Sequence, residues 1–161
     1  MSKIAPCLWF DGQAEEAANF YVSTFNACGQ DATTGDILHY SDAGPGPKGS
    51  VLSVTFMLAG QEFIALNGGP HFTFSPAVSL FVKCADQAEV DRFWEKLSDG
   101  GKPGQCGWLT DRFGVSWQIV PTAIGDMLKG ADAARAGRVM QTLLTMTKLD
   151  IDALRKAYEA A

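Results

Sequence analysis

A short residue pattern occurs twice in this chain, once in each half. Gln13-Ala14-Glu15 recurs as Gln87-Ala88-Glu89, and the aromatic pair Phe20-Tyr21 recurs as Phe93-Trp94. In both copies a short apolar run comes before the motif, and a glycine follows the helical stretch. A repeat of whole elements restricts the fold to two copies of one supersecondary unit, each of which must bury an apolar face.

The spacing of apolar residues assigns elements to both copies. Helical spacing over residues 13–28 and 86–98 predicts two helices, with Asp86 as the N-cap of the second and Trp94 as its buried anchor. β-prone runs bounded by Gly, Pro and Asp predict strands: Ile4–Phe10, Asp36–Ser41, Val51–Ala59, Glu62–Asn67, Ala77–Cys84, Gln105–Thr110 and Val115–Val120. The sequence therefore predicts an α+β fold with two small sheets, each backed by a helix.

The part of the chain after Pro121 is predicted to be helical. Apolar stripes recur there at helical spacing, over Ile124–Lys129, Ala133–Thr147 and Ile151–Ala160. A chain of 161 residues can bury enough surface to fold without disulfides or metals. We therefore predict a single domain over 1–161, with modules at about 1–75 and 76–121 and a helical tail at 122–161.

Charge and cysteine usage exclude several classes of protein. The net charge is −5 and Lys and Arg do not cluster, so no nucleic acid is expected as a partner. No apolar run reaches the roughly 18 residues that a membrane-spanning helix needs. No C-x-x-C motif or signal peptide is present, which predicts a cytoplasmic protein with reduced thiols. The four cysteines are Cys7, Cys28, Cys84 and Cys106.

Several segments resemble the PhnB-like family of the vicinal oxygen chelate superfamily, which includes glyoxalase I, bleomycin-resistance proteins and extradiol dioxygenases. The most specific is Asp111–Pro121, in which Asp111-x-x-Gly114 precedes Trp117-Gln118. The others are Leu8–Gly12, Ala14–Ala17, Phe20-Tyr21, Ser79–Val82, Cys106–Trp108 and Lys148–Ile151. The resemblance implies paired βαβββ modules, a cupped sheet and a homodimer. Many relatives carry the name 3-demethylubiquinone-9 3-methyltransferase, which says little about mechanism.

The same resemblance leads us to expect no metal and no other cofactor. Enzymes of the superfamily bind a divalent metal through His, Glu or Gln on inner strand faces. Those positions fall near Pro6, on Ser79 and on Gln118 here. Proline has no donor atom in its side chain and serine ligates rarely, so the three ligands of a usual catalytic metal site are not assembled.

Strand alternation makes Gln118, Ser79 and Phe81 candidates for binding a small organic molecule. If Trp117 and Ile119 pack under the helices, Gln118 points into a cleft, where its amide could hydrogen-bond a ligand. It could equally be a structural glutamine satisfied by the backbone. Ser79 and Phe81 share a face in the same way, and Phe81 could form a wall of the cleft or belong to the core.

Trp108, Arg112 and His71 complete the candidate set. Trp108 and Arg112 flank the last hairpin and could clamp an anionic or planar ligand. Arg112 could instead pair with Asp111 or Asp99 on the surface. His71 lies between the two halves and could carry a proton, but no carboxylate near it in sequence orients it, which favours a surface role.

The sequence therefore predicts a metal-independent small-molecule-binding protein whose reaction stays unassigned. Two alternatives remain: a metal-dependent lyase or dioxygenase of the same fold, and the methyltransferase of the family name. No glycine-rich turn joins a strand directly to a helix, as a nucleotide or methyl-donor site requires. We also predict a homodimer, because the first helix and the tail expose more apolar surface than one sheet covers. The tail residues concerned are Val139, Met140, Leu143 and Leu144.

Overall fold

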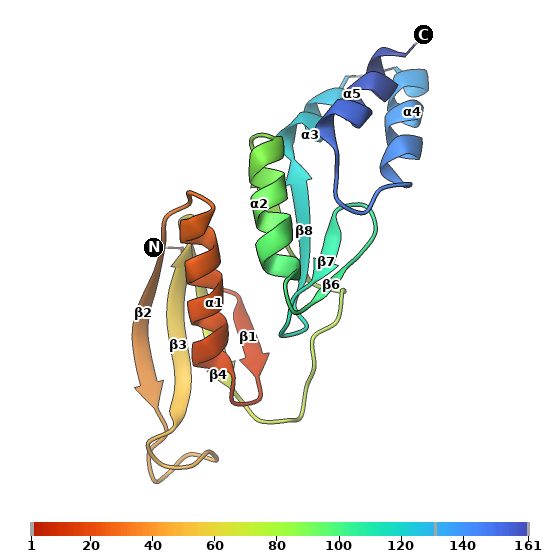
Figure 1. The fold of residues 1–161 in the computed structure, drawn as a ribbon. Helices are drawn as coiled ribbons and strands as arrows, with labels where there is room; N and C mark the ends of the chain where they lie inside the picture. Colours follow the sequence, from red (N-terminus) through yellow and green to blue (C-terminus); the bar gives the residue numbers. More distant parts are fainter. Residues whose placement is uncertain (1, 131, 161) are drawn as a thin grey trace. The chain divides into compact units, whose positions relative to one another are not determined.

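The chain folds into two compact units that divide between Phe74 and Ser75. The structure is a computed structural model and describes residues 2–130 and 132–160. Each unit contains a four-stranded sheet with a helix on one face, and further helices follow in the second unit (Figure 1). The α+β class predicted from the repeat is confirmed, with two sheets and five helices among the described residues. The single-domain organisation stays a prediction.

The first unit has the element order β-α-β-β-β. Its elements are β1 (Cys7–Phe10), α1 (Ala14–Ala27), β2 (Ala32–His39), β3 (Val51–Leu58) and β4 (Gln61–Asn67). The sheet order is β1-β4-β3-β2, in which β1 and β4 run parallel and the other neighbours antiparallel. Small buried side chains bring α1 close to this sheet: Ala14, Ala17 and Ala18. Tyr21 of α1 then stacks on Phe56, with ring centroids 6.0 Å apart.

The second unit repeats the same topology. Its elements are β5 (Ser79–Cys84), α2 (Gln87–Ser98), β6 (Lys102–Pro103), β7 (Trp108–Thr110) and β8 (Ser116–Pro121). The sheet order is β5-β8-β7-β6, again with the first and last strands of the module parallel. Asp86 is the N-cap of α2 as predicted, because its Oδ1 accepts a hydrogen bond from the Glu89 amide at 2.9 Å. The core between α2 and the sheet contains Val90, Phe93, Leu97, Leu109, Trp117 and Ile119.

A buried carboxylate shapes the turn before β8. Asp111 is 3% exposed, and its Oδ1 accepts hydrogen bonds from the amides of Phe113 and Val115 at 2.8 and 3.0 Å. Its Oδ2 accepts a third from the indole nitrogen of Trp117 at 2.8 Å. The turn and the inward position of Trp117 are therefore fixed by one side chain. This explains structurally why Asp111-x-x-Gly114 stands before Trp117.

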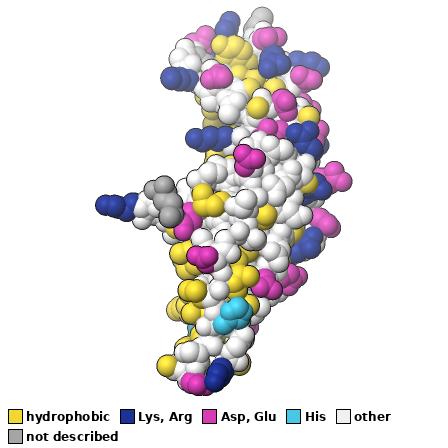
Figure 2. Space-filling model, turned by 90° about the vertical axis from the view of Figure 1, so that its left-hand side faces the viewer, with side chains coloured by type: hydrophobic (Ala, Val, Ile, Leu, Met, Phe, Trp, Pro, Cys, Tyr) yellow, Lys and Arg dark blue, Asp and Glu magenta, His cyan; other side chains and the backbone are white. Residues whose placement is uncertain are grey.

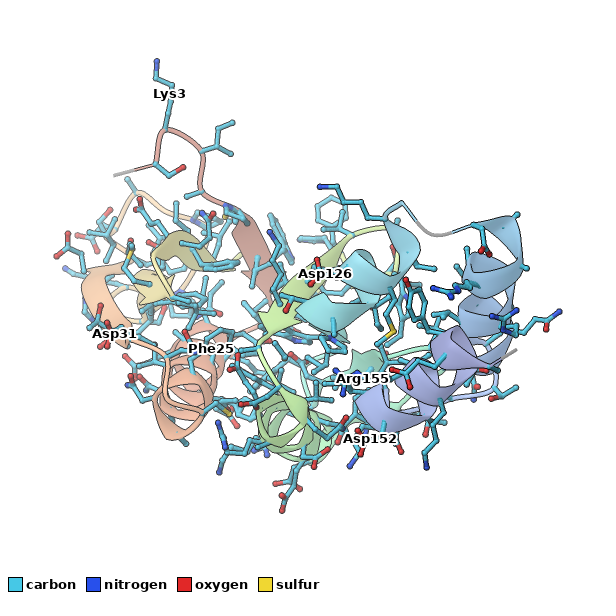
Figure 3. The ribbon with its side chains drawn as sticks, turned by 90° about the horizontal axis from the view of Figure 1, so that it is seen from above. Lys3, Phe25, Asp31, Asp126, Asp152 and Arg155 are labelled. Atoms are coloured by element: carbon cyan, nitrogen blue, oxygen red, sulfur yellow. The ribbon has the colours of Figure 1, made fainter. Side chains whose placement is uncertain are left out.

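The tail forms a small helical core of its own. Its elements are α3 (Thr122–Leu128), α4 (Ala133–Leu143) and α5 (Ile151–Glu159). Apolar side chains from all three and from the α4–α5 connection pack together: Ile124, Met127, Val139, Leu149, Ile151 and Leu154. Arg138 holds α4 to the end of α5, since its Nε donates to the Ala157 carbonyl at 2.9 Å. Figure 3 marks Asp152 and Arg155, which form an ion pair of 3.9 Å within α5.

The segment Met146–Ile151, called here the tail strap, attaches the tail to the second unit. The amides of Cys106 and Gly107 donate to the carbonyls of Met146 and Thr147, both at 2.8 Å. The helix predicted over Ala133–Thr147 is wrong in its last turn, because α4 ends at Leu143 and the chain then turns into the strap. The N-cap of the next helix, α5, is Asp150, since its Oδ1 accepts from the Ala153 amide at 3.1 Å.

Charged side chains are mixed on the molecular surface. On the face that Figure 2 shows, Lys and Arg lie among Asp and Glu rather than in one basic patch. None of the described helices has both the length and the hydrophobicity needed to cross a bilayer.

Candidate functional site

The face of the second sheet that points away from α2 carries four of the six candidate residues. Trp117 and Ile119 are 1% and 0% exposed, so strand alternation turns Gln118 to the opposite side of β8. Phe81 of β5 and Trp108 of β7 lie directly beside Gln118 in the register. Ser79 lies one step along β5 on the same side. These four residues, Ser79, Phe81, Trp108 and Gln118, are called the open-face cluster below.

A hydrogen bond orients the polar pair of this cluster. The Gln118 Nε2 donates to Ser79 Oγ at 3.0 Å, and both residues are half-buried. The carbonyl oxygen of the Gln118 side chain accepts no hydrogen bond from the described part of the chain, and no buried polar side-chain atom described is left unpartnered. That oxygen is therefore accessible as an acceptor, while the Ser79 hydroxyl can still donate a proton.

Two aromatic side chains lie on either side of the Gln118 amide. Phe81 is 52% exposed and Trp108 is half-buried. A phenylalanine exposed to this extent is not packed into the core of its unit, and a role for Phe81 as a wall of a cleft stays a prediction. The arrangement offers flat apolar surface beside one acceptor and one donor, the combination found in many small-molecule sites.

The two remaining candidates are Arg112 and His71. Arg112 lies in the turn between β7 and β8, where its Nη2 is 3.2 Å from Asp99 Oδ2 and its Nε donates to the Asp99 carbonyl. The pairing with Asp99, one of the alternatives for this residue, is therefore present. His71 belongs to the first unit, where it lines a pocket described below.

The first unit contains a pocket of about 700 Å³ that sequence reasoning missed. It is lined by the β1–α1 turn, the β2–β3 connection and the chain after β4. Asn67 ties these segments together, because its Oδ1 accepts from the Ala14 amide at 2.9 Å and its Nδ2 donates to the Val51 carbonyl at 3.0 Å. The Tyr40 hydroxyl donates to the Asn67 carbonyl. Three acidic residues face this pocket: Asp11, Glu15 and Glu16.

Neither a metal centre nor an activated thiol is evident in the described residues. No group of three or more His, Cys, Asp or Glu side chains there could hold a metal ion. Partial burial raises the pKa of the Cys7 thiol. A raised pKa favours the protonated thiol, which is a poor nucleophile at neutral pH.

Comparison with known proteins gives a family and several structural relatives. The model of the family described as 3-demethylubiquinone-9 3-methyltransferase matches residues 2–120. A Bacillus cereus PhnB protein of that description is 39% identical, with a TM-score of 0.66 over 74% of this chain and 99% of its own. A Pseudomonas aeruginosa protein is 23% identical, with a TM-score of 0.61 over 75% of this chain and 98% of its own. Among curated proteins, none matches this chain.

Proposed function

This chain belongs to the PhnB-like family described as 3-demethylubiquinone-9 3-methyltransferase, and we propose that it binds a small organic molecule on its open-face cluster without a metal. One observation carries the proposal: the Gln118 amide is held by Ser79 between two aromatic side chains on neighbouring strands. A fixed acceptor and donor orient a ligand, and the aromatic surface supplies the contact area.

We propose binding and no reaction, because the open-face cluster offers no acid or base. Serine, phenylalanine, tryptophan and glutamine do not exchange protons readily near neutral pH. The shortage of grouped metal-ligand side chains in the described chain favours a metal-independent site. Methyl transfer is not part of the proposal, because the turns before α1 and α2 lack the glycine-rich loop that cradles a nucleotide-like donor.

Gln118→Ala is expected to weaken ligand binding by about five- to tenfold, because one oriented hydrogen bond is worth roughly 1–1.5 kcal/mol. Native mass spectrometry of the purified protein should show a small organic molecule that co-purifies with the wild type. Gln105→Ala, an exposed glutamine outside the cluster, should retain it.

Three results would contradict the proposal. Equal retention of the molecule by Gln118→Ala would remove the open-face cluster as its site. One metal ion per chain in elemental analysis would favour the lyase or dioxygenase alternative. Saturable binding of S-adenosylmethionine would favour the methyltransferase.

The homodimer stays a prediction, and two of the four tail residues named for it are exposed enough to take part in an interface. Val139 is 0% exposed and packs in the tail core, and Leu143 packs against that core. Met140 and Leu144 are 42% and 60% exposed, one helical turn apart on or beside α4. We expect Met140→Glu with Leu144→Glu to convert a dimer into a monomer in light scattering, while Thr145→Glu should leave it a dimer. A wild-type monomer at micromolar concentration would refute the prediction.

A further inference from the structure

The two units share one topology, but the same corner is filled in the second unit and open in the first. In each unit this corner lies where the first strand turns into the helix, beside the connection between the second and third strands. In the second unit the tail strap occupies it, contacting the start of α2 and the β6–β7 connection. In the first unit the corresponding segments line the pocket of about 700 Å³.

The strap shows what such a corner holds. The Gln87 side-chain amide pairs with the strap backbone as a neighbouring strand would. Its Nε2 donates to the Leu149 carbonyl at 3.0 Å, and its Oε1 accepts from the Ile151 amide at 2.8 Å. The Lys148 ammonium lies 2.8 Å from Asp91 Oδ1. The Leu149 side chain is 1% exposed. The corner therefore binds a bent segment through hydrogen bonds to its backbone and one basic side chain, while the apolar side chain of that segment packs into the tail core.

The open corner of the first unit carries more negative charge than the filled corner of the second. Asp11, Glu15 and Glu16 face the pocket, and no described residue forms an ion pair or hydrogen bond with their carboxylates. None of the residues that line it in the described chain is Lys or Arg. A favourable helix dipole accounts for acids in the first turn of α1, but it does not account for Asp11, which precedes the helix.

The wall of this pocket is fixed before any ligand arrives. The Tyr40 ring lies between Gly44 and Gly46, so closely that a Cβ at either glycine would overlap it. The loop is closed by backbone hydrogen bonds from Tyr40 to Ser50 at 2.8 Å and from Gly49 to Tyr40 at 2.9 Å. A pre-formed pocket loses little conformational entropy when it binds.

We propose that this pocket binds a peptide segment of a partner protein in which a Lys or Arg adjoins an apolar residue. The acidic rim would pair with the basic side chain, as Asp91 pairs with Lys148, and the apolar side chain would enter between the segments. The inference is independent of the open-face cluster, because all lining residues belong to the first unit.

The test uses the full-length protein and a blocked peptide with the sequence of residues 144–153 in which both aspartates are replaced by asparagine. We expect saturable binding in calorimetry, and we expect Glu15→Gln with Glu16→Gln to weaken it by about tenfold. The control variant Glu95→Gln with Glu159→Gln changes the net charge equally, at exposed positions of the second unit that do not line this pocket, and should bind as the wild type does. A peptide with Gln in place of its Lys should also bind about tenfold more weakly.

Several outcomes would overturn the proposal. Absence of binding would do so, as would equal binding by the double variant or by the peptide without lysine. Binding of lysine amide as tightly as the peptide would indicate a site for small cations instead. If Gln87→Ala weakens binding and the acidic variant does not, the peptide has displaced the tail strap from the second unit.

Discussion

Asp111→Ala is expected to lower the free energy of unfolding by about 3–5 kcal/mol. The substitution leaves the amides of Phe113 and Val115 and the Trp117 indole without the acceptor they share. Each buried donor that loses its partner costs roughly 1–3 kcal/mol, and hydrogen bonds to a charged acceptor are the stronger ones. Urea denaturation followed by tryptophan fluorescence measures the loss.

Two further variants distinguish the loss of the shared hydrogen-bond acceptor from the loss of a negative charge. Asp111→Asn keeps one acceptor oxygen and should lose less than the alanine variant. Asp99→Ala removes an exposed partner of Arg112 and should cost less than about 1 kcal/mol, as exposed ion pairs usually do. If Asp111→Ala costs no more than Asp99→Ala, the carboxylate does not hold the turn.

Gly101→Ala is expected to destabilise the second unit by about 3 kcal/mol, or to prevent β6 from pairing with β7. A Cβ at this position would overlap the Thr110 carbonyl oxygen and would lie 2.8 Å from the backbone of Asp111. Backbone atoms cannot rotate away as a side chain can, so the strand itself must shift, and overpacking of this kind is among the costly substitutions.

Gly125→Ala is the matched control for this prediction. Gly125 lies inside α3, and a Cβ there meets nothing within 4 Å. Alanine in a helix interior is more stable than glycine by roughly 0.5–1 kcal/mol. Thermal unfolding of both variants should therefore move in opposite directions, and a neutral Gly101→Ala would contradict the close approach described for that residue.

The order of helices and strands follows from local sequence, but the residues at which they begin and end depend on contacts with distant parts of the chain. The repeat predicts both modules because helical spacing and alternation are local properties. The pattern Thr33-Thr34-Gly35-Asp36 resembles a loop, yet it lies in β2, which begins at Ala32 and contains an irregularity in register between Thr34 and Ile37. Strand β6 consists of Lys102 and Pro103 alone and offers no periodicity to detect.

The buried face of a helix is also predicted only approximately from local sequence. Trp94 was predicted as the buried anchor of α2, but the structure leaves it half-buried and buries its neighbour Phe93 completely. Adjacent apolar residues differ by about 100° around a helix, so spacing alone places the buried stripe only to within one residue.

The alternation of side chains along a strand predicts part of the open-face cluster. It cannot predict the pocket of the first unit. The placement of Gln118 beside Ser79 follows from counting along two strands, because β5 and β8 are neighbours in register. The pocket depends on three segments, around residues 11–16, 40–51 and 67–71, meeting in space. Asn67 is the residue that joins them, and nothing in its local sequence distinguishes it.

Hydrogen exchange at two amides of the second unit reports whether the tail strap is attached. The family model ends at residue 120, so the strap and the helices around it lie outside the matched region. Cys106 and Gly107, with φ angles of 59° and 84°, donate their amide protons to the strap itself. Those two protons are shielded from solvent deuterium by the strap's carbonyls, and each detachment of the tail exposes both to exchange at once, whatever the rest of the sheet is doing.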